Sequence, residues 1–505
     1  MLKTALFSIL TISAIQATEC RLVNNQGIKP NIISGKKLSV FWSQEYSGTD
    51  LVKEEIESVS WAKNVYVSVF DSGFEQEFIK ISKNTKVDSS FFTRNRKPIA
   101  HHGTSVANII NGKGLYDVSN KVEYLGLRNV KFSAVYGSEF KRYETIGIFP
   151  KIISNSYGWK DYEAISNLSI SAKEKNILWF LASGNDYPLP ISDIENYSGA
   201  LLVGSHAPSG LQSSFSQISN NVITLAGGDD YQASIDGNGK HINFGGTSGA
   251  TPLVAGSIVN IASLIPNITY EQTKKLIQKT NLPSFESSNG FINNPGIFNA
   301  YKAYEVAKKI AEHCQNNENP NNENCISEEL LDEDNYNFNN RIQYAPNEND
   351  ILDKSISCEQ RQENLKELRR ISLLINTPTL WEKLETVYNK LGYTKNSEYY
   401  KNLKNRFEIT SDLILEMEQG ALNALKNERY FEAYFRYQDY FSDNYQIQLA
   451  NLLITEQSPS KYWVTHFLKE LKGPLSSTVR NTLEKALTKV DSELAEYIKQ
   501  VLNKD

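Results

Sequence analysis

Three polar residues stand where together they could carry out acyl transfer. Asp71 follows the apolar run VYVSVF, and Gly73 lets the chain turn away after it. His102 comes directly before Gly-Thr and a run of apolar residues with helical spacing, and Ser248 opens the apolar run after Gly-Gly-Thr. A serine hydroxyl becomes a useful nucleophile when an imidazole removes its proton and a buried carboxylate orients that imidazole.

Taken alone, each of these residues also has an ordinary structural explanation. Asp-Ser-Gly makes a common turn. A histidine at a helix start is disfavoured as the imidazolium by the positive helix end, so it needs a carboxylate to compensate, a role that is open to Asp71. His101 competes with His102 for the role of base.

Acyl transfer further needs hydrogen-bond donors for the negative oxygen that develops on the substrate. The backbone amide of Ser248, at the start of a helix, supplies one donor. Asn185, in LASGND at the end of an apolar run, supplies a side-chain amide as the second. Pro252 is tolerated in the first turn of the helix that Ser248 opens.

The elements that must position these residues follow from the hydrophobic pattern. Between residues 64 and 264, short apolar or β-branched runs such as KIISNSYG and NILWFLASGN alternate with helical stretches. Runs that are apolar on both faces and separated by helices predict a parallel sheet covered on each side, an α/β fold. Ligands bind at the carboxyl ends of such strands.

These segments resemble the subtilisin-like serine protease (subtilase, S8) family. The patterns Asp-Ser-Gly, His-Gly-Thr-x-Val-Ala and Gly-Thr-Ser-x-Ala-x-Pro match in the family's order, and the resemblance covers residues 39–311. It implies a three-layer peptidase domain in which Asp71 orients His102, His102 is base and then acid, Ser248 attacks, and Asn185 donates to the oxyanion. Because the motif places the base directly before Gly-Thr, it favours His102 and leaves His101 as a surface neighbour.

The same resemblance implies a substrate cleft. The segment SNSYG resembles the family's substrate-pairing strand, to which a peptide would add as a further strand. The LASG segment resembles the opposite wall of the S1 pocket. The substrate-binding residues implied are Ser156, Tyr157, Gly158, Ala182, Ser183 and Gly184.

Some features depart from the family pattern. The chain between Ala17 and Asn64 is too short for a full propeptide, so either the protein folds unaided or its carboxyl-terminal helices act as chaperone or inhibitor. No calcium loop is recognisable after the histidine helix, and we expect no metal and no cofactor. The span from Arg128 to Pro150 is shorter and more polar than usual, which leaves the outer edge of the cleft undefined.

Five regions are expected along the chain. The first 17 residues have Lys3, an apolar run and small residues, which predicts a signal peptide and hence a secreted or periplasmic protein. The alternative, a membrane anchor, needs roughly 20 apolar residues, and no later run is long enough to span. We expect an N-terminal segment at 18–38, the peptidase domain at 39–311, an exposed Asn-rich and acidic linker at 312–357 and an all-helical domain at 358–505.

The helical domain is indicated by its periodicity. Leu380, Leu384 and Val387 step by helical spacing, and Ser476 and Ser477 precede another such run as N-cap candidates. A tyrosine stripe is interpreted as core rather than as a binding surface: Tyr430, Tyr434 and Tyr437.

Cysteine content and charge limit the remaining possibilities. The four cysteines allow three pairings, of which Cys314–Cys325 is the simplest, and their spacing argues against zinc. A net charge of -5 on 505 residues gives no support for a nucleic-acid partner.

Two classes of function remain open. The first is an active secreted serine endopeptidase acting on polypeptides. The second is a catalytically silent scaffold whose helical domain recruits a protein partner. A third arrangement has the helical domain regulate the peptidase by covering its cleft.

Overall fold

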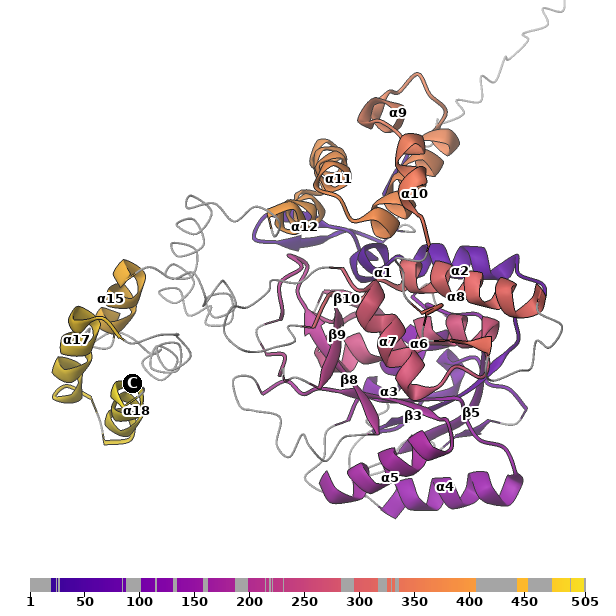
Figure 1. Ribbon diagram of the computed structural model, residues 1–505, viewed down its shortest axis with the longest axis horizontal. Helices are drawn as coiled ribbons and strands as arrows, with labels where there is room; N and C mark the ends of the chain where they lie inside the picture. Colours follow the sequence, from indigo (N-terminus) through magenta and orange to yellow (C-terminus); the bar gives the residue numbers. More distant parts are fainter. Residues whose placement is uncertain are drawn as a thin grey trace, which may run out of the picture.

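The computed structural model describes residues 20–23, 25, 28–83, 85–87, 101–113, 116–129, 134–157, 162–186, 199–213, 215–217, 219, 221–229, 231–282, 295–316, 325–327, 329–331, 336–405, 443–452, 475–490 and 492–503 (Figure 1). The predicted signal peptide and the stripe Tyr430, Tyr434 and Tyr437 lie outside these residues.

A seven-stranded sheet forms the centre of the peptidase region. Its strand order is β4-β5-β3-β6-β7-β8-β9, and every neighbouring pair is parallel. The strands are β3 (Val65–Asp71), β4 (Lys86–Val87), β5 (Val122–Asn129), β6 (Ile152–Asn155), β7 (Leu178–Ala182), β8 (Ala200–His206) and β9 (Val222–Gly227). The carboxyl ends of β3, β6 and β7 therefore meet at one edge of the sheet.

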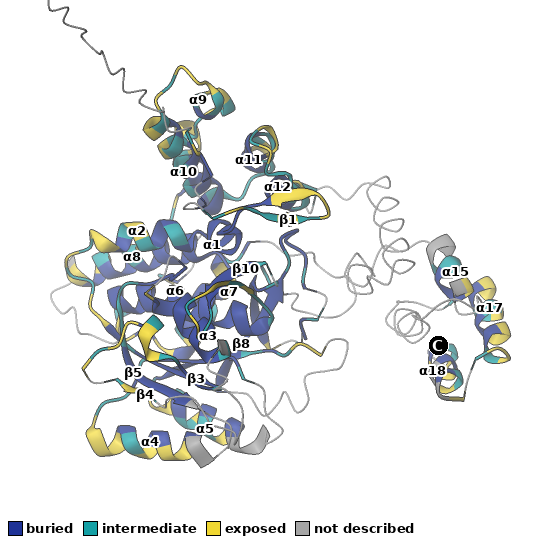
Figure 2. Ribbon diagram, turned by 180° about the vertical axis from the view of Figure 1, so that it is seen from behind, coloured by how far each residue is buried: buried dark blue, intermediate teal, exposed yellow. Residues whose placement is uncertain are grey.

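Both faces of the sheet are covered by helices, because successive side chains of a strand point to opposite faces. On β7, Phe180 packs into the core that includes α3 (His101–Asn111) and α6 (Thr247–Leu264). Its neighbour Trp179 packs into the core with α4 (Ala134–Ile146) and α5 (Tyr162–Glu174). Figure 2 shows these two helix layers on either side of the strands. The α/β fold with a parallel sheet is confirmed.

Shorter elements complete this region. The hairpin of β10 (Gln232–Ile235) and β11 (His241–Phe244) leads directly into α6. The other elements are β1 (Asn31–Ile33), β2 (Lys36–Leu38), α1 (Trp42–Ser47), α2 (Thr49–Glu57), η1 (Gln76–Phe78), α7 (Tyr270–Thr280), α8 (Ala300–Asn316), η5 (Asn339–Tyr344) and α9 (Glu348–Leu352).

In the described part of the carboxyl-terminal region the secondary structure is helical, with short turns between the helices, as expected. Its helices are α10 (Cys358–Ile375), α11 (Pro378–Lys390), α12 (Thr394–Asn405), α15 (Asp443–Leu452), α17 (Ser477–Leu487) and α18 (Ser492–Leu502). Leu384 and Val387 of α11 are buried, and Ser476 caps α17 by accepting the Val479 amide hydrogen. Within the described residues, no helix combines the length and the apolar character needed to cross a bilayer.

Helices α10 to α12 share one continuous core with the peptidase region. Tyr46 of α1 stacks on Tyr399 of α12 with ring centroids 3.7 Å apart. Arg369 of α10 forms two hydrogen bonds of 2.8 Å with the carboxylate of Asp50 in α2. Through such contacts, helices α10, α11 and α12 pack against the sheet-and-helix layers. The boundaries of the helical domain remain a prediction.

The expected exposure of the linker at 312–357 is wrong at several positions. Ile326, Leu331, Phe338 and Ile351 are buried and belong to the shared core. The reason is that single apolar side chains, spaced along a polar stretch, are enough to anchor it to a neighbouring core even when the average composition is hydrophilic.

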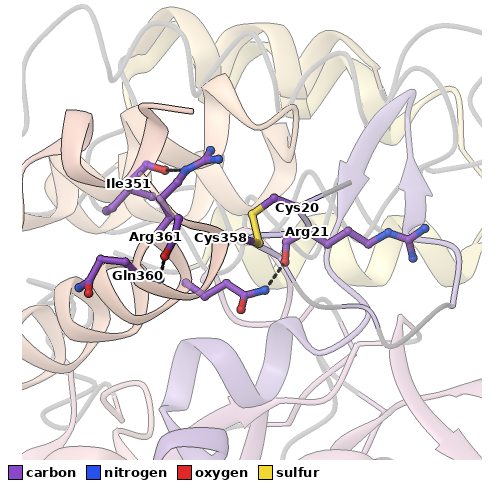
Figure 3. Close-up of a disulfide and its surroundings, with 8 residues drawn as sticks. Cys20, Arg21, Ile351, Cys358, Gln360 and Arg361 are labelled. Atoms are coloured by element: carbon purple, nitrogen blue, oxygen red, sulfur yellow. Dashed lines mark hydrogen bonds between the residues drawn. A yellow bond between two sulfur atoms is a disulfide. The ribbon is translucent and has the colours of Figure 1, made fainter. Parts of the chain in front are cut away.

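Two disulfides join the four cysteines. Cys314 pairs with Cys325, as predicted, and Cys20 pairs with Cys358 at a sequence separation of 338 residues. Figure 3 shows that the second bridge ties the N-terminal segment to the first turn of α10. Beside it, the Gln362 side-chain amide donates to the Arg21 carbonyl at 3.0 Å.

Glu45 lies at the interface between α1 and the C-terminal helices, and its titration makes the stability of this interface depend on pH. It is 8% exposed, accepts a hydrogen bond from the Ser39 hydroxyl at 2.8 Å and lies near Arg369 and Asp50. Burial raises the pKa of its carboxyl to about 7 against the partial opposition of Arg369. The native state therefore holds a proton that the unfolded chain has released between about pH 4.5 and 7.

We expect Glu45→Gln to remove this pH dependence. In the wild type, the free energy of unfolding should fall by up to about 1.4 kcal/mol per pH unit as pH rises through that window, because the native state binds one more proton than the unfolded chain there. Above the raised pKa the contribution is flat. Urea unfolding at several pH values checks this, with Glu54→Gln, an exposed carboxylate in an ion pair with Lys366, as control. An identical pH slope in Glu45→Gln and the wild type would contradict it.

Candidate active site

Asp71 and His102 form a direct pair at the carboxyl end of β3. The His102 Nδ1 atom lies 2.6 Å from Oδ1 of Asp71, a residue with no exposed surface. The Ser72 backbone amide donates to the same oxygen at 2.7 Å. A carboxylate held in this way keeps the proton of neutral His102 on Nδ1 and leaves Nε2 free to act as a base.

Glycine at position 103 allows this close approach. A Cβ there would lie 2.2 Å from the Gly73 carbonyl oxygen and 3.2 Å from the Asp71 Cβ atom. The Thr104 hydroxyl in the same turn accepts the Glu75 amide hydrogen at 2.9 Å, which fixes the chain after Asp71. His102 lies within the first turn of α3, which begins at His101.

The environment of His102 shifts its pKa in two opposing directions. Burial lowers the pKa, and the charge and hydrogen bond of Asp71 raise it, with a net rise above 6.5. The ring also lies edge-on to Phe244 of β11, with centroids 5.2 Å apart. His102 is therefore an imidazolium at acidic pH and a free base once the pH exceeds its raised pKa.

Ser248 is the second residue of α6 and lies at the same edge of the sheet. Its hydroxyl donates to the Ser156 carbonyl at 3.1 Å, and the Ser156 hydroxyl donates to the Ser248 carbonyl at 2.9 Å. Between the described residues no hydrogen bond joins Ser248 Oγ to His102. Phe244 lies near both segments, because its ring contacts His102 and its Cδ1 atom lies 3.6 Å from where a Cβ on Gly249, the residue after Ser248, would stand.

Asn185, just beyond β7, is oriented by the residue before Ser248. Its Oδ1 accepts hydrogen bonds from the Thr247 amide at 2.9 Å and from the Thr247 hydroxyl at 3.0 Å. This leaves the Nδ2 amide as the donor of the side chain, and a Cβ on Gly246 would lie 3.1 Å from it. The first amide groups of a helix lack intrahelical acceptors, so the Ser248 amide is available as a second donor.

The predicted substrate-binding residues lie around this edge where they are described. Ser156 and Tyr157 follow β6, whereas Gly158 is outside the described residues. Ala182 ends β7, and Ser183 donates its amide hydrogen to the Val203 carbonyl at 3.0 Å.

Thr247 and Phe244 are site residues that the sequence did not single out. The Gly-Thr-Ser motif contains Thr247 and could have pointed to it, because it directly precedes the nucleophile candidate. No sequence signal placed Phe244 beside His102, because the hairpin that carries it is defined only in three dimensions. Among the described residues, no three His, Cys, Asp or Glu side chains come together as a metal-binding group.

Comparison with known proteins assigns the chain to a protein family. The family model described as Peptidase_S8, subtilase family, matches residues 62–353, more than half of the chain. Subtilisin amylosacchariticus of Bacillus subtilis subsp. amylosacchariticus is 24% identical over 292 residues, 54% of this chain and 71% of the relative. Alkaline elastase YaB of Bacillus sp. (strain YaB) is 26% identical over 190 residues, 35% and 49% of the two chains.

Solved structures are similar at lower identity. A chain from the study of subtilase cytotoxin SubAB assembly is 21% identical with a TM-score of 0.43, covering 54% of this chain and 97% of the other. A cold adapted subtilisin-like serine proteinase is 22% identical with a TM-score of 0.38, covering 47% and 88%.

Proposed function

This chain belongs to the subtilase family of serine peptidases, and we propose that it is a secreted endopeptidase that uses Asp71, His102 and Ser248 as its catalytic triad. The observation that carries the proposal is the 2.6 Å contact between His102 and the fully buried Asp71. A buried carboxylate on a partly exposed histidine is the arrangement that a general base needs.

In the proposed first step, a peptide carbonyl enters beside Ser248. The Ser248 hydroxyl leaves the Ser156 carbonyl and turns to His102, whose Nε2 takes its proton as Oγ bonds to the carbonyl carbon. The oxygen that becomes negative is stabilised by Asn185 Nδ2 and the Ser248 amide. Catalytic hydrogen bonds are often formed only in the complex with substrate, which accords with the resting position of this hydroxyl.

In the second half of the reaction His102 acts as an acid and then again as a base. It gives its proton to the leaving amine, which breaks the peptide bond and leaves an ester on Ser248. Water then attacks the ester carbon while His102 takes its proton, and the acid product departs as His102 returns that proton to Ser248 Oγ. Asp71 stays ionised and stabilises the imidazolium in both halves.

Substrate binding and cellular location are further parts of the proposal. A peptide would pair with Ser156, Tyr157 and Gly158 and place a side chain against residues 182–184. The apolar N-terminal run is proposed as a signal peptide, and two disulfides are typical of proteins in an oxidising compartment.

Labelling by a fluorophosphonate probe tests the proposed function, because such probes react only with an activated serine. Folded wild-type protein should be labelled and should cleave members of a peptide library, whereas heat-unfolded protein should not be labelled. Protein that is folded and stays unlabelled would contradict the proposal.

Replacing Asn185 by Ala should lower kcat by about 10² to 10³, the cost of removing one oxyanion donor, a magnitude known from subtilisin. KM should change little, because the interaction strengthens only as the oxygen becomes negative. Steady-state kinetics on a peptide substrate check this. Asn402→Ala is a suitable control, because its amide donates to the Ser209 carbonyl away from the nucleophile. A kcat equal to that of the wild type would remove Asn185 from the mechanism.

Recruitment of a partner, or regulation, by the helical region is the second proposal. Because α10 to α12 belong to the shared core, deletion after Ser357 would expose buried surface. Deletion after Asn405 keeps these helices and tests the remaining helices alone. If they cover the cleft, this truncation should raise peptidase activity.

A further inference from the structure

Gln217 lies beside the loop that carries Asn185 but is not part of the proposed triad or the oxyanion donors. The inference rests on the proposed function, since it concerns the aim of Asn185. We propose that Gln217 is a positioning residue that fixes the turn at residues 184–186, so that the Asn185 amide points at the developing oxyanion.

Gln217 holds the chain on both sides of Asn185. Its backbone amide donates to the Gly184 carbonyl at 3.0 Å. Its side-chain Oε1 accepts the Asp186 amide hydrogen at 3.4 Å. Asn185 is the single residue between these two anchored positions, so its backbone has little freedom to rotate.

The packing around Gly184 makes this contact close. A Cβ at Gly184 would lie only 1.9 Å from Gln217 Oε1, and Gly184 has a φ of +110°, a conformation that other residues rarely adopt. The Gln217 side chain thus occupies the space directly against the loop. Gln217 is 7% exposed, so neighbouring atoms hold it in place.

Thr247 orients the side chain of Asn185. Its hydroxyl accepts the Gly184 amide hydrogen at 3.3 Å, and its amide donates to Asn185 Oδ1 at 2.9 Å. The helix that carries Ser248 therefore sets the rotation of the Asn185 side chain, while Gln217 sets the backbone from which that side chain extends. Both segments must therefore be in place for Asn185 Nδ2 to point at the developing oxyanion.

The segment that carries Gln217 is itself attached to the central sheet. The Ser205 amide of β8 donates to the Ser216 hydroxyl at 2.9 Å, and the Ser213 amide donates to the Ser205 carbonyl at 2.8 Å. Gln217 therefore links the turn that carries Asn185 to the buried strand β8, which limits the movement of the Asn185 amide. A donor held on a rigid support stabilises a transition state without reorganisation during the reaction.

Gln217→Met tests the proposal, because Met has nearly the same shape but lacks the oxygen that accepts the Asp186 amide. We expect kcat to fall about 10- to 100-fold with KM within about threefold, since a displacement of about 1 Å at a catalytic group can cost that much. The matched control is Gln44→Met, which changes another buried glutamine, one whose side-chain amide donates to the Tyr116 carbonyl at 2.6 Å. It should keep kcat within about threefold.

A double-mutant cycle separates positioning from general loosening. In an Asn185→Ala background the donor is already absent, so Gln217→Met should cause no further loss of kcat. An equal loss in both backgrounds, or no loss in either, would overturn the role of Gln217. Should Met prevent folding, as judged by thermal unfolding, Gln217→Ala provides the same comparison.

The outcomes also separate this inference from the proposed function. A folded wild type that neither cleaves peptides nor reacts with the fluorophosphonate would contradict the proposed function itself. An active wild type in which Asn185→Ala is impaired and Gln217→Met is not would overturn the role of Gln217 alone.

Discussion

Replacement of Ser248 by Ala is expected to lower kcat by about 10⁶, which leaves only the residual rate that binding and the oxyanion donors provide. The physical reason is that the proposed acyl bond forms through the Ser248 hydroxyl, which alanine lacks. Ser248 is 8% exposed and its hydroxyl donates to the Ser156 carbonyl, so the loss of this hydrogen bond should cost about 1 kcal/mol of stability. Peptide hydrolysis and fluorophosphonate labelling should both disappear while the unfolding temperature barely changes.

Ser257→Ala is the matched control for this variant. Ser257 lies on the same helix, is 1% exposed, and its hydroxyl donates to the Leu253 carbonyl at 2.7 Å. The Ser257→Ala substitution removes a buried hydroxyl from α6 away from the candidate site, so labelling should persist. Retained labelling in Ser248→Ala would show that another residue is the nucleophile.

Replacement of Asp71 by Asn is expected to lower kcat by about 10⁴, because the amide favours the wrong tautomer of His102. It should also move the acidic limb of the pH profile. In the wild type, Asp71 raises the pKa of His102 above 6.5 against the effect of burial, so kcat/KM rises as the pH increases through that raised value. Without the carboxylate only the lowering by burial remains, and the acidic limb should shift to lower pH.

Stability should change in the matching direction. A histidine with a raised pKa stabilises the native state fully below its unfolded pKa, and this contribution is lost as pH rises through the folded value. Asp71→Asn should therefore lose stability mainly at acidic pH. NMR titration of the His102 ring and the pH dependence of kcat/KM measure both effects.

Asp117→Asn controls for the loss of any buried carboxylate. Asp117 pairs with Lys53 at 2.9 Å and with Lys80 at 3.0 Å, and its side chain is 2% exposed. This variant is expected to be less stable but to keep the wild-type acidic limb. If Asp71→Asn also kept that limb, His102 would not be the group that titrates in catalysis.

The sheet and the pairing of Asp71 with His102 could be predicted because their signals are local. Runs such as VYVSVF are buried on both faces, and the residue at the end of the run, Asp71, is placed by the strand itself. Glycine at 103 and threonine at 247 stand in short motifs, so a few consecutive residues specify the geometry that positions His102 and Ser248.

The contacts of the C-terminal helices could not be predicted in this way. The pairing of Arg369 with Asp50 and the stacking of Tyr46 on Tyr399 join residues more than 300 positions apart, and no spacing rule connects them. The same holds for Cys20 and Cys358, because four cysteines leave three pairings open. The position of Gln217 beside Asn185 likewise depends on which strands neighbour each other.

The bridge between Cys20 and Cys358 encloses the whole peptidase region in a covalent ring. A peptidase stored among its own copies is exposed to their attack, and surface loops are the usual places of cleavage. One break anywhere inside the ring leaves both fragments attached to each other, so they cannot diffuse apart. Such a nicked molecule would run as a single band on a non-reducing gel and would separate into two only after thiol treatment.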